Sequence, residues 1–537
     1  MEFNLADLFE NAVDHFGDRD YLVCAGKRRT YAEMEARANR LAHHLAKNGV
    51  GPGDHVGIYA FNCVEWVETL WAVFKLRAVW VNINYRYVED ELAYVFDNAD
   101  LQALVYEREF APRIVAVRET MPGLGHCVEI EDGSGVDSSA LGAVPYEDAL
   151  AAESPERDFA PRSPDDHYIL YTGGTTGMPK GVVWRHEDVF FALGGGNDPA
   201  TGSRAERPEE MLDREPVQSV MMAIAPMMHG ASQWCVMTSA FVGRKCVLMR
   251  KFDPEAIWQQ IQDENVGTIM ITGDAMGRPL IEALDANAGK WDVSPLVVVT
   301  SSAAVFSPVV KDAFFEHFPN LIIIDSIGSS ESGNQGMAII TKGNTAMKGG
   351  GPTVSAGPGT VVIDPETGEK IEAGSGVIGK VARAGDIPLE YYKDPVKTAE
   401  TFITFEGVRY VMPGDFAQVE ADGSVTMLGR GSVSINSGGE KIFPEEVEQA
   451  VKSHPDVYDC LVIGVPDERW GNRVAAVIEV REGAAPELEA LQAHCRTKVA
   501  GYKVPREVHA VSKVERAPSG KPDYRWAKRV ALGEITA

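Results

Sequence analysis

The chain has 537 residues, with 51 Lys and Arg against 78 Asp and Glu, so its formal net charge is −27. A hydrophobic fraction of 45% and a charged fraction of 24% are typical of a soluble globular protein, which excludes a disordered, collagen-like or coiled-coil chain. At roughly 100–200 residues per domain, the length predicts two to four domains, each able to bury its own core.

The acidic balance also limits the partners. A negative surface repels a phosphate backbone, so we expect no nucleic acid as the main partner, and an anionic substrate must meet a local basic pocket. No apolar run reaches the roughly 18 residues of a membrane span, and the N-terminus does not resemble a signal peptide. The seven cysteines include no C-x-x-C pair. These features predict a cytoplasmic protein with reduced thiols and no integral membrane segment.

The first hundred residues alternate helical and strand-like segments. An amphipathic helix is expected near the N-terminus, and the pair Thr30 and Glu33 forms a capping box that opens a helix ending at Gly49. Alternating strands and helices follow at residues 55–61, 65–75, 78–83, 88–96 and 103–106. This β-α-β order predicts an α/β fold with a parallel sheet covered by helices.

Later segments are short and rich in β-branched residues or Met, as strands buried on both faces are. They lie at residues 217–225, 267–272, 296–300 and 321–325, and we expect them at the centre of a large sheet. The last hundred residues contain shorter elements at 425–428, 444–453, 457–465, 474–480 and 487–499. This pattern predicts a small α+β domain, joined to the large domain near Gly429–Ser432.

The strongest chemical signal is the run Tyr171-Thr-Gly-Gly-Thr-Thr-Gly-Met-Pro-Lys180-Gly181, which follows an apolar strand. Its glycines leave backbone N–H groups free to form a concave nest, its threonines add hydroxyls, and Lys180 adds a cation, all of which suit a polyphosphate. The run is not a Walker A loop, because Met178 and Pro179 separate the last loop glycine from the lysine. A flexible surface turn is the alternative, and the density of donors beside a strand end disfavours it.

This run resembles the signature loop of the adenylate-forming superfamily, which includes acyl-CoA synthetases, non-ribosomal peptide adenylation domains and firefly luciferases. It matches the family pattern at every position except Gly173, where the family usually has Ser. Further motifs follow in the family's order, so the resemblance covers nearly the whole chain. It implies a large N-terminal adenylation domain of layered sheets and helices, residues 1–430, and a small mobile α+β C-terminal domain, residues 431–537.

Three motifs of the large domain resemble parts of the family's reaction site. Pro226-Met-Met-His229-Gly resembles the P-x-x-H/aromatic motif beside the acyl-adenylate, although a lone His after a Met-rich strand is more often structural. Ser302 stands where the family has a small-residue loop near the nucleotide base. Ser330 and Glu331 resemble the Thr-Glu of Y-G-x-T-E, which implies that Glu331 holds Mg²⁺. Ile327 stands where the family has an aromatic that stacks on adenine.

The remaining motifs lie near and beyond the domain junction. Asp415 resembles the family's ribose-binding aspartate, and Arg430 resembles an arginine of the ribose and phosphate region. The loop at 436–446 resembles the one that lines the thiol tunnel after the small domain rotates. Lys521 resembles the lysine that bridges the attacking carboxylate and the α-phosphate, with Glu515 in place of the motif's proline.

The resemblance thus implies catalytic roles for Lys521, Glu331 and His229, with Glu331 as the metal ligand. The implied ATP- and AMP-binding residues are Thr172, Gly174, Thr175, Thr176, Gly177, Lys180, Ser302, Ser326, Ser330, Asp415 and Arg430. The implied CoA-binding residues are Ser437, Gly438 and Gly439, and Ser432 is the implied hinge, where the family usually has Asp or Lys.

Taken together, the resemblance implies that the chain is an AMP-forming carboxylate–CoA ligase that uses ATP, Mg²⁺ and CoA. The sequences around Lys180 and Lys521 resemble those of a bacterial branch of acyl-CoA synthetases, which acts on medium- or long-chain fatty acids and on steroid side-chain carboxylates. Met227, Met228, Trp234 and the small residues of Gly273–Gly277 predict an apolar pocket with room for a bulky acyl group.

Three alternatives stay open: an enzyme that delivers the acyl group to a carrier protein, a luciferase-like oxygenase, and a catalytically inactive nucleotide-binding sensor. The joint presence of Glu331, Asp415, Arg430 and Lys521 disfavours the sensor, since a pure binder does not need Lys521. A homodimer is the assembly considered.

Overall fold

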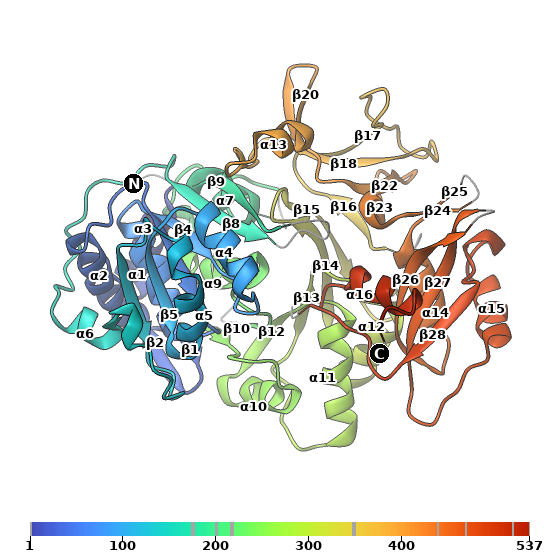
Figure 1. The fold of residues 1–537 in the computed structure, drawn as a ribbon, viewed down its shortest axis with the longest axis horizontal. Coiled ribbons are helices and arrows are strands. Elements are labelled where there is room, and N and C mark those ends of the chain that lie inside the picture. The colour runs from blue at the N-terminus through green and yellow to red at the C-terminus, as the bar shows by residue number, and fades with distance from the viewer. Residues whose placement is uncertain are drawn as a thin grey trace.

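The computed structural model describes residues 3–172, 178–198, 202–214, 220–345, 351–437, 440–467, 470–517 and 520–535. The predicted alternation of the first hundred residues is present (Figure 1). Helix α1 spans Leu5–Phe16, and α2 spans Tyr31–Lys47. The capping box at the start of α2 is complete, because the Thr30 hydroxyl accepts from the Glu33 N–H at 3.1 Å and Glu33 Oε2 accepts from the Thr30 N–H at 2.9 Å.

One sheet of the large domain carries the signature loop. Its strand order is β19-β9-β8-β4-β3-β5-β6-β7, and only β9 runs opposite to the other strands. The strands are β3 (His55–Tyr59), β4 (Val79–Asn82), β5 (Leu101–Glu107), β6 (His126–Ile130), β7 (Val144–Pro145), β8 (His167–Thr172), β9 (Lys180–Arg185) and β19 (Glu390–Tyr391). The β8–β9 hairpin therefore lies at one side of a parallel sheet, next to the short strand β19.

The second sheet contains the predicted central strands in parallel, in the order β1-β11-β10-β12-β13-β14. The strands are β1 (Asp20–Cys24), β10 (Val220–Ala223), β11 (Cys246–Leu248), β12 (Val266–Ile271), β13 (Val298–Ser301) and β14 (Ile322–Ser329). Strand β2 (Lys27–Thr30) pairs antiparallel with β1 at the edge. The prediction that the later segments occupy the centre of a large sheet is confirmed.

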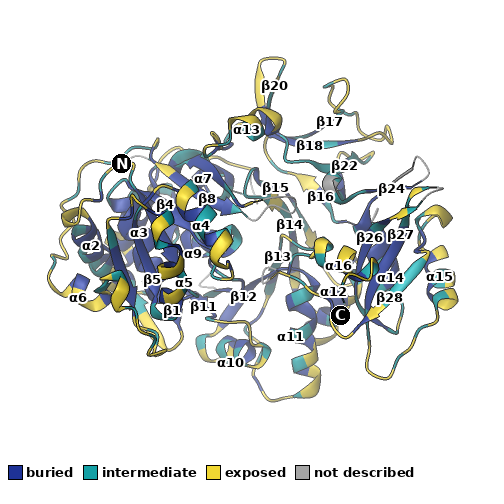
Figure 2. Cartoon of the chain, in the orientation of Figure 1, coloured by how far each residue is buried: buried dark blue, intermediate teal, exposed yellow. Residues whose placement is uncertain are grey.

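Helices fill the space between the two sheets and cover their outer faces (Figure 2). Helices α1, α2, α3 (Val64–Lys75) and α9 (Gly230–Phe241) share one core with strands of both sheets. Successive side chains of a strand point to opposite faces of the sheet, so strand β4 contributes to two cores. Trp80 faces this inner layer, whereas Val79 and Val81 face α4 (Glu89–Asn98) and α5 (Ala111–Val117). Helices α10 (Pro254–Glu264), α11 (Asp274–Ala286) and α12 (Pro308–His317) cover the other face of the second sheet.

The second sheet continues into antiparallel strands, of which sequence analysis predicted only the one at 425–428 and grouped it with the elements of the C-terminal domain. Strand β15 (Gly333–Ile340) turns back along β14, and the order continues β16-β23-β22-β18-β21-β20, with β17 beside β18. These strands are β16 (Thr353–Ala356), β17 (Thr360–Ile363), β18 (Ile378–Ala384), β20 (Phe402–Phe405), β21 (Val408–Val411), β22 (Asp415–Val419) and β23 (Val425–Arg430). They extend the sheet of the large domain beyond β15, and β17, β18 and β20 are at the top of Figure 1.

The C-terminal elements form a small α+β unit, as predicted. Strands β26 (Val457–Asp467), β27 (Gly471–Val480) and β28 (Glu507–Val511) make its sheet. Helices α14 (Pro444–Lys452) and α15 (Leu488–Arg496) cover one face, and α16 (Tyr524–Ala531) covers the other. The hairpin of β24 (Ile435–Ser437) and β25 (Glu440–Ile442) precedes them.

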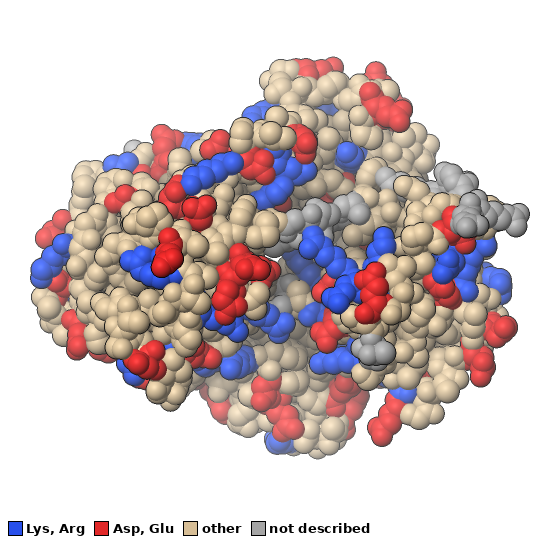
Figure 3. Space-filling model, viewed as in Figure 1, with Lys and Arg blue, Asp and Glu red and all other residues tan. Residues whose placement is uncertain are grey.

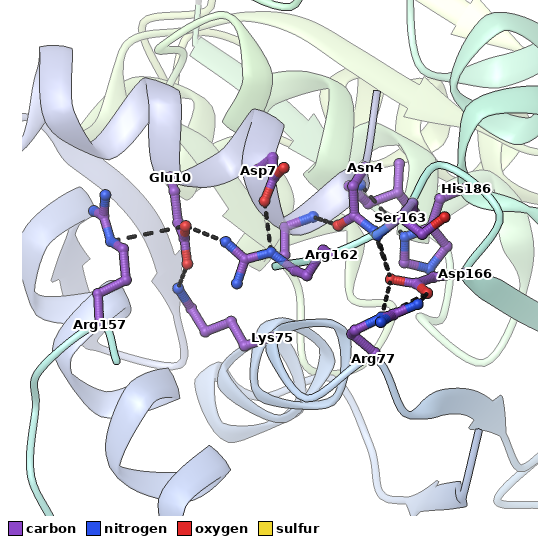
Figure 4. A network of polar contacts seen from close by, with 12 residues as sticks. Asn4, Asp7, Glu10, Lys75, Arg77, Arg157, Arg162, Ser163, Asp166 and His186 are labelled. Carbon is purple, nitrogen blue, oxygen red and sulfur yellow. Dashed lines mark hydrogen bonds and ion pairs between the residues drawn. The ribbon is translucent and has the colours of Figure 1, made fainter. Parts of the chain in front are cut away.

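A buried polar network anchors the N-terminal helix to the rest of the large domain (Figure 4). Lys75 of α3 is buried and donates to Glu10 of α1 and to Glu35 of α2. Asn4, which caps α1, donates to Asp166 Oδ2 at 3.0 Å, and Arg77 pairs with the same carboxylate at 2.9 Å. A buried ammonium is tolerated here because two carboxylates surround it.

No helix in the described part of the chain is long and apolar enough to cross a membrane. All seven cysteines carry free thiols.

Candidate active site

The β8–β9 hairpin presents both ends of the signature run. In its antiparallel register Thr172 lies opposite Lys180, at the mouth of the turn. The Lys180 ammonium lies 3.8 Å from Asp394 Oδ2 and 5.3 Å from the centre of the Tyr391 ring. Gly174, Thr175, Thr176 and Gly177 lie outside the described residues. The structure therefore fixes the two positions that flank the predicted phosphate loop.

The motif with Glu331 lies beside this hairpin. Strand β14 runs to Ser329, so Ser326 and Ile327 are on a strand and Ser330 and Glu331 are in the turn to β15. The indole N–H of Trp184, on β9, donates to the Ser330 carbonyl at 3.0 Å. The Tyr391 hydroxyl donates to Glu331 Oε1 at 3.2 Å. The turn with Ser330 and Glu331 is thus joined by hydrogen bonds to strands β9 and β19, which are far from each other in the sequence.

Glu331 fits the role of an Mg²⁺ ligand. Mg²⁺ prefers hard oxygen ligands and usually keeps several waters, so its site needs a carboxylate that solvent can reach. Glu331 is half-buried, and within the described ranges its Oε2 makes no hydrogen bond or ion pair with the protein. The donor chemistry and the accessibility both suit a hydrated cation bound to phosphate.

His229 stands at the N-cap of α9, after the buried residues Met227 and Met228. Its Nε2 atom is buried, and no described residue hydrogen-bonds to it. Burial, together with the positive charges of Lys521 and Arg86, lowers the pKa of His229 to about 3. The imidazole is therefore neutral at physiological pH, which suits a wall or a hydrogen-bonding group better than a cation.

The segment with Lys521 docks on the large domain at this point. Gly520 has φ +73°, and a Cβ there would lie 2.9 Å from the Thr272 carbonyl oxygen and 3.0 Å from Ala275 Cβ. Thr272 and Ala275 lie at the junction of β12 and α11, on the large domain. The backbone that carries Lys521 consequently reaches the large domain at a distance that only glycine allows.

Three further contacts join the two domains along α11. The Lys452 ammonium lies 3.4 Å from Asp274 Oδ2, and both side chains are almost fully buried. The Tyr458 hydroxyl donates to Glu282 Oε2 at 3.2 Å, and the Arg278 guanidinium lies over the Tyr458 ring at 5.1 Å.

Lys and Arg side chains gather near the boundary of the domains, in the middle of the visible face (Figure 3). This arrangement agrees with the expected local basic site on an acidic protein.

The predicted nucleotide residues outside the loop lie at strand ends. Asp415 begins β22 and is paired in register with Arg430 at the end of β23. Ser302 follows β13, and its N–H donates to the Ile271 carbonyl at 3.4 Å, at the carboxyl end of the parallel strand β12. Ligands of open α/β sheets bind at such carboxyl ends. The side chain of Arg430 is outside the described part of the structure.

The predicted CoA residues lie apart from this site. Ser437 is buried on β24, and Gly438 and Gly439 lie outside the described residues. The β24–β25 hairpin is at the right of Figure 1, whereas β8 and β9 are at the left of centre. Ser432 lies in the short helical turn Gly431–Val433 between β23 and β24. The structure thus brings the segment with Lys521 to the large domain and leaves the hairpin with Ser437 away from β8 and β9.

Sequence analysis missed two residues that organise the site. Asn82, at the end of β4, accepts from the Tyr171 N–H at 2.8 Å and donates to the Met228 carbonyl at 2.7 Å. It therefore joins the strand before the signature loop to the segment before His229. A polar residue at the carboxyl end of a predicted parallel strand was the available signal. Tyr391 is the second, and no local pattern marks it.

Comparisons with known proteins agree with this geometry. A family model described as AMP-binding enzyme matches residues 9–392, and one described as AMP-binding enzyme C-terminal domain matches residues 446–521. The chain is 53% identical over 535 residues to the 3-oxocholest-4-en-26-oate–CoA ligase of Rhodococcus rhodochrous, covering 98% of this chain and 96% of that protein. It is 51% identical over 535 residues to the medium/long-chain-fatty-acid–CoA/3-oxocholest-4-en-26-oate–CoA ligase of Mycolicibacterium smegmatis, covering 99% and 97%.

Among solved structures, the anthranilate CoA ligase AuaEII in complex with anthranoyl-AMP has the same fold, with a TM-score of 0.84 at 24% identity over 99% of this chain and 98% of that one. The layered large domain and the smaller C-terminal unit are common to both. With the family model covering most of its length and full-length relatives about half identical to it, the chain belongs to the AMP-binding enzymes, the adenylate-forming superfamily that its motifs resemble.

Proposed function

We propose that the chain is an AMP-forming carboxylate–CoA ligase that uses ATP, Mg²⁺ and CoA. The observation that carries the proposal is the docking of Gly520 against Thr272 and Ala275 of the large domain, which brings the charge of Lys521 close enough to lower the pKa of His229. In the same domain a hydrogen bond joins β9, the strand that begins with Lys180, to the turn with Glu331. Full-length similarity to proteins named as CoA ligases supports the same activity.

In the first half-reaction a carboxylate oxygen of the acid attacks the α-phosphorus of ATP. The bond to the β-phosphate breaks, which gives acyl-AMP and pyrophosphate. Lys521 brings the two anions together and stabilises the charge that develops between them. Lys180 and the loop residues Gly174, Thr175, Thr176 and Gly177 bind the departing phosphates, with Thr172 at the loop's start. Mg²⁺ bound at Glu331 neutralises phosphate charge.

The other proposed nucleotide contacts are assigned from the positions of the residues in the fold. Asp415 and Arg430, opposite each other on β22 and β23, bind the ribose side. Ser302, Ser326 and Ser330 line the base and α-phosphate side, where Ile327 covers the adenine ring as an aliphatic face. His229 is a neutral wall between the acyl group and Lys521.

In the second half-reaction the CoA thiol attacks the acyl carbonyl carbon, and AMP leaves with the bridging oxygen. The small domain rotates about the 431–433 turn, which withdraws Lys521 and brings Ser437, Gly438 and Gly439 to the thiol. The present position of the β24–β25 hairpin, apart from β8 and β9, is what the first half-reaction requires. One moving domain then serves two reactions at one site.

The substrate class is a medium- or long-chain or steroid side-chain carboxylic acid, as the names of the most similar relatives suggest. Met227, Met228 and Trp234 are buried beside His229 and supply an apolar wall. The expectation about Gly273 needs correction. It does not open space for the acyl group, because a Cβ there would lie 2.3 Å from the Val305 carbonyl oxygen.

The test is product analysis with ATP, Mg²⁺, CoA and a panel of fatty, aromatic and steroid acids. We expect a new acyl-CoA with fatty or polycyclic acids. Turnover that favours acetate or amino acids would contradict the substrate class, and acyl-AMP without thioester would favour the carrier-protein alternative. The free thiols support a cytoplasmic location, and the homodimer stays a prediction that light scattering can check.

A further inference from the structure

Tyr391 occupies a fixed position between two elements of the site. It ends the two-residue strand β19, which pairs antiparallel with β9, so that Tyr391 lies opposite Val182, two residues from Lys180. The side chain is 4% exposed, and its ring packs against Phe402 with centroids 5.9 Å apart. Its N–H donates to Thr398 Oγ1 at 3.0 Å. The backbone and the ring are therefore both held.

The two ends of this side chain contact the two charged groups of the site. The hydroxyl donates to Glu331 Oε1 at 3.2 Å, and the face of the ring lies 5.3 Å from the Lys180 ammonium. A hydrogen bond to one carboxylate oxygen restricts the rotation of the Glu331 side chain and leaves Oε2 for a cation. The ring attracts the ammonium electrostatically. A single aromatic residue thus relates the position of the metal-binding carboxylate to that of the phosphate-binding cation.

We propose that Tyr391 is a positioning residue that holds Glu331 in the orientation needed for the nucleotide-bound divalent cation. This inference rests on the proposed function, because it assumes that Glu331 binds that cation. Tyr391 touches neither the reacting atoms nor the cation and acts through Glu331. Residues that hydrogen-bond to metal ligands typically change metal affinity by 10–100-fold when mutated.

The sharpest variant is Tyr391→Phe, which keeps the ring, its packing on Phe402 and its contact with Lys180, and removes only the hydroxyl. The matched control is Tyr392→Phe, because the neighbouring Tyr392 hydroxyl donates to Asp100 Oδ2 at 2.8 Å rather than to Glu331. The full-length proteins are saturated with a non-hydrolysable ATP analogue, and Mn²⁺ is titrated while free Mn²⁺ is followed by electron paramagnetic resonance.

We expect Tyr391→Phe to raise the dissociation constant of Mn²⁺ by about 10-fold or more, with unchanged affinity for the metal-free analogue. Tyr392→Phe should bind Mn²⁺ as the wild type does. Glu331→Gln should weaken Mn²⁺ binding more strongly, and adding Tyr391→Phe to it should have no further effect, because the hydroxyl acts through the carboxylate. Effects that add, or a Tyr391→Phe protein with wild-type Mn²⁺ affinity, would overturn the inference.

A functional readout separates this inference from the proposed function. Tyr391→Phe should slow acyl-AMP formation and raise the Mg²⁺ requirement, yet leave thioester formation from supplied acyl-AMP and CoA unchanged. If Mn²⁺ binding depends on Glu331 and on the Tyr391 hydroxyl but the wild type forms no acyl-AMP from any acid, the proposed function fails while the positioning role stands. If the wild type is an active ligase and Tyr391→Phe has the same Mg²⁺ requirement, the positioning role fails alone.

Discussion

The positive charge of Lys521, on the C-terminal domain, acts on His229 of the large domain: burial of the imidazole, together with the positive charges of Lys521 and Arg86, lowers the pKa of His229 to about 3. Gly520, which precedes this lysine, contacts Thr272 of the large domain, so the segment with Lys521 is at the boundary of the two domains. The neutral histidine does not repel the lysine as an imidazolium would. This is the arrangement that the proposed adenylation step needs.

Replacing this lysine should separate the two half-reactions. We expect Lys521→Ala to slow acyl-AMP formation by roughly 10²–10³-fold, since one preorganised electrostatic group is lost from the transition state. Thioester formation from supplied acyl-AMP and CoA should stay within a few-fold of wild type. Pre-steady-state kinetics of each step measures both. Lys528→Ala, an exposed change on α16, is the control and should alter neither rate. Equal losses in both steps would refute the assignment.

Gly520 should tolerate no side chain in the docked state. Its φ of +73° and the 2.9 Å distance from a Cβ to the Thr272 carbonyl predict that Gly520→Ala slows acyl-AMP formation by at least about tenfold. Gly533→Ala is a matched control, because Gly533 has φ +69° but nothing within 4 Å of its Cβ position. The control carries the backbone strain without the clash. Adenylation rates that match for the two variants would show that the contact with Thr272 does not matter.

The buried pair of Asp274 and Lys452 should stabilise the docked domain. Asp274→Asn keeps the Oδ1 acceptor for the Ser307 N–H, 2.8 Å away, and removes the charge that faces Lys452. A loss of roughly 1 kcal/mol of docking energy corresponds to about a fivefold slower acyl-AMP formation. Thioester formation from acyl-AMP should be equal or faster, as the domain leaves more readily.

The control for that change is on the same helix. Asp285→Asn removes an exposed carboxylate that pairs with His317 at 2.8 Å, inside the large domain. It should leave both rates unchanged. A wild-type adenylation rate in Asp274→Asn would contradict a docking role for the pair.

Acid should destabilise the fold through His186. This residue begins α7 (His186–Leu193), and its Nδ1 accepts from the Leu5 N–H at 3.4 Å (Figure 4). Burial lowers the pKa of His186 to about 3, below the value of about 6.5 in the unfolded chain. Between these values the unfolded state binds the extra proton, so the free energy of unfolding falls as the pH falls.

At pH 5 this single group should cost about 2 kcal/mol relative to pH 7. His186→Gln, which cannot take the charge, should lose less stability than the wild type over that range. Thermal unfolding midpoints at both pH values measure the difference. His15→Gln, at the exposed end of α1, should follow the wild type. Parallel pH profiles for wild type and His186→Gln would contradict the assignment.

Local signals in the sequence predicted local structure well. The Thr30–Glu33 capping box and the β-α-β order of the first hundred residues depend on neighbours in the chain, and the structure has both. Strand β14 extends four residues beyond the predicted end at 325 because β15 folds back and pairs with it. The antiparallel strands β16, β17, β18, β20, β21 and β22 went unpredicted, since long-range partners rather than a clear alternation define them. Strand β23 was predicted at 425–428, but it pairs with β16 and β22 of the large sheet instead of joining the C-terminal sheet.

The same difference between local and long-range signals separates the residues of the candidate site. Lys180, Glu331 and Lys521 could be proposed from the sequence because their motifs are continuous in it. Tyr391 was not, because its two partners are distant in the chain and meet only in the fold. Gly273 was interpreted as open space, whereas its φ of +58° and the close Val305 carbonyl show a tight backbone contact. A glycine alone does not distinguish these two reasons for lacking a side chain.

The most direct test of the central claim uses a carboxylic acid labelled with ¹⁸O in both carboxyl oxygens, incubated with ATP, Mg²⁺, CoA and the protein. Attack on the α-phosphorus followed by thiol attack on the carbonyl transfers one labelled oxygen to AMP. We therefore predict acyl-CoA together with AMP that is heavier by one ¹⁸O, and unlabelled pyrophosphate. Acyl-CoA with unlabelled AMP, or label in inorganic phosphate, would contradict an acyl-adenylate ligase.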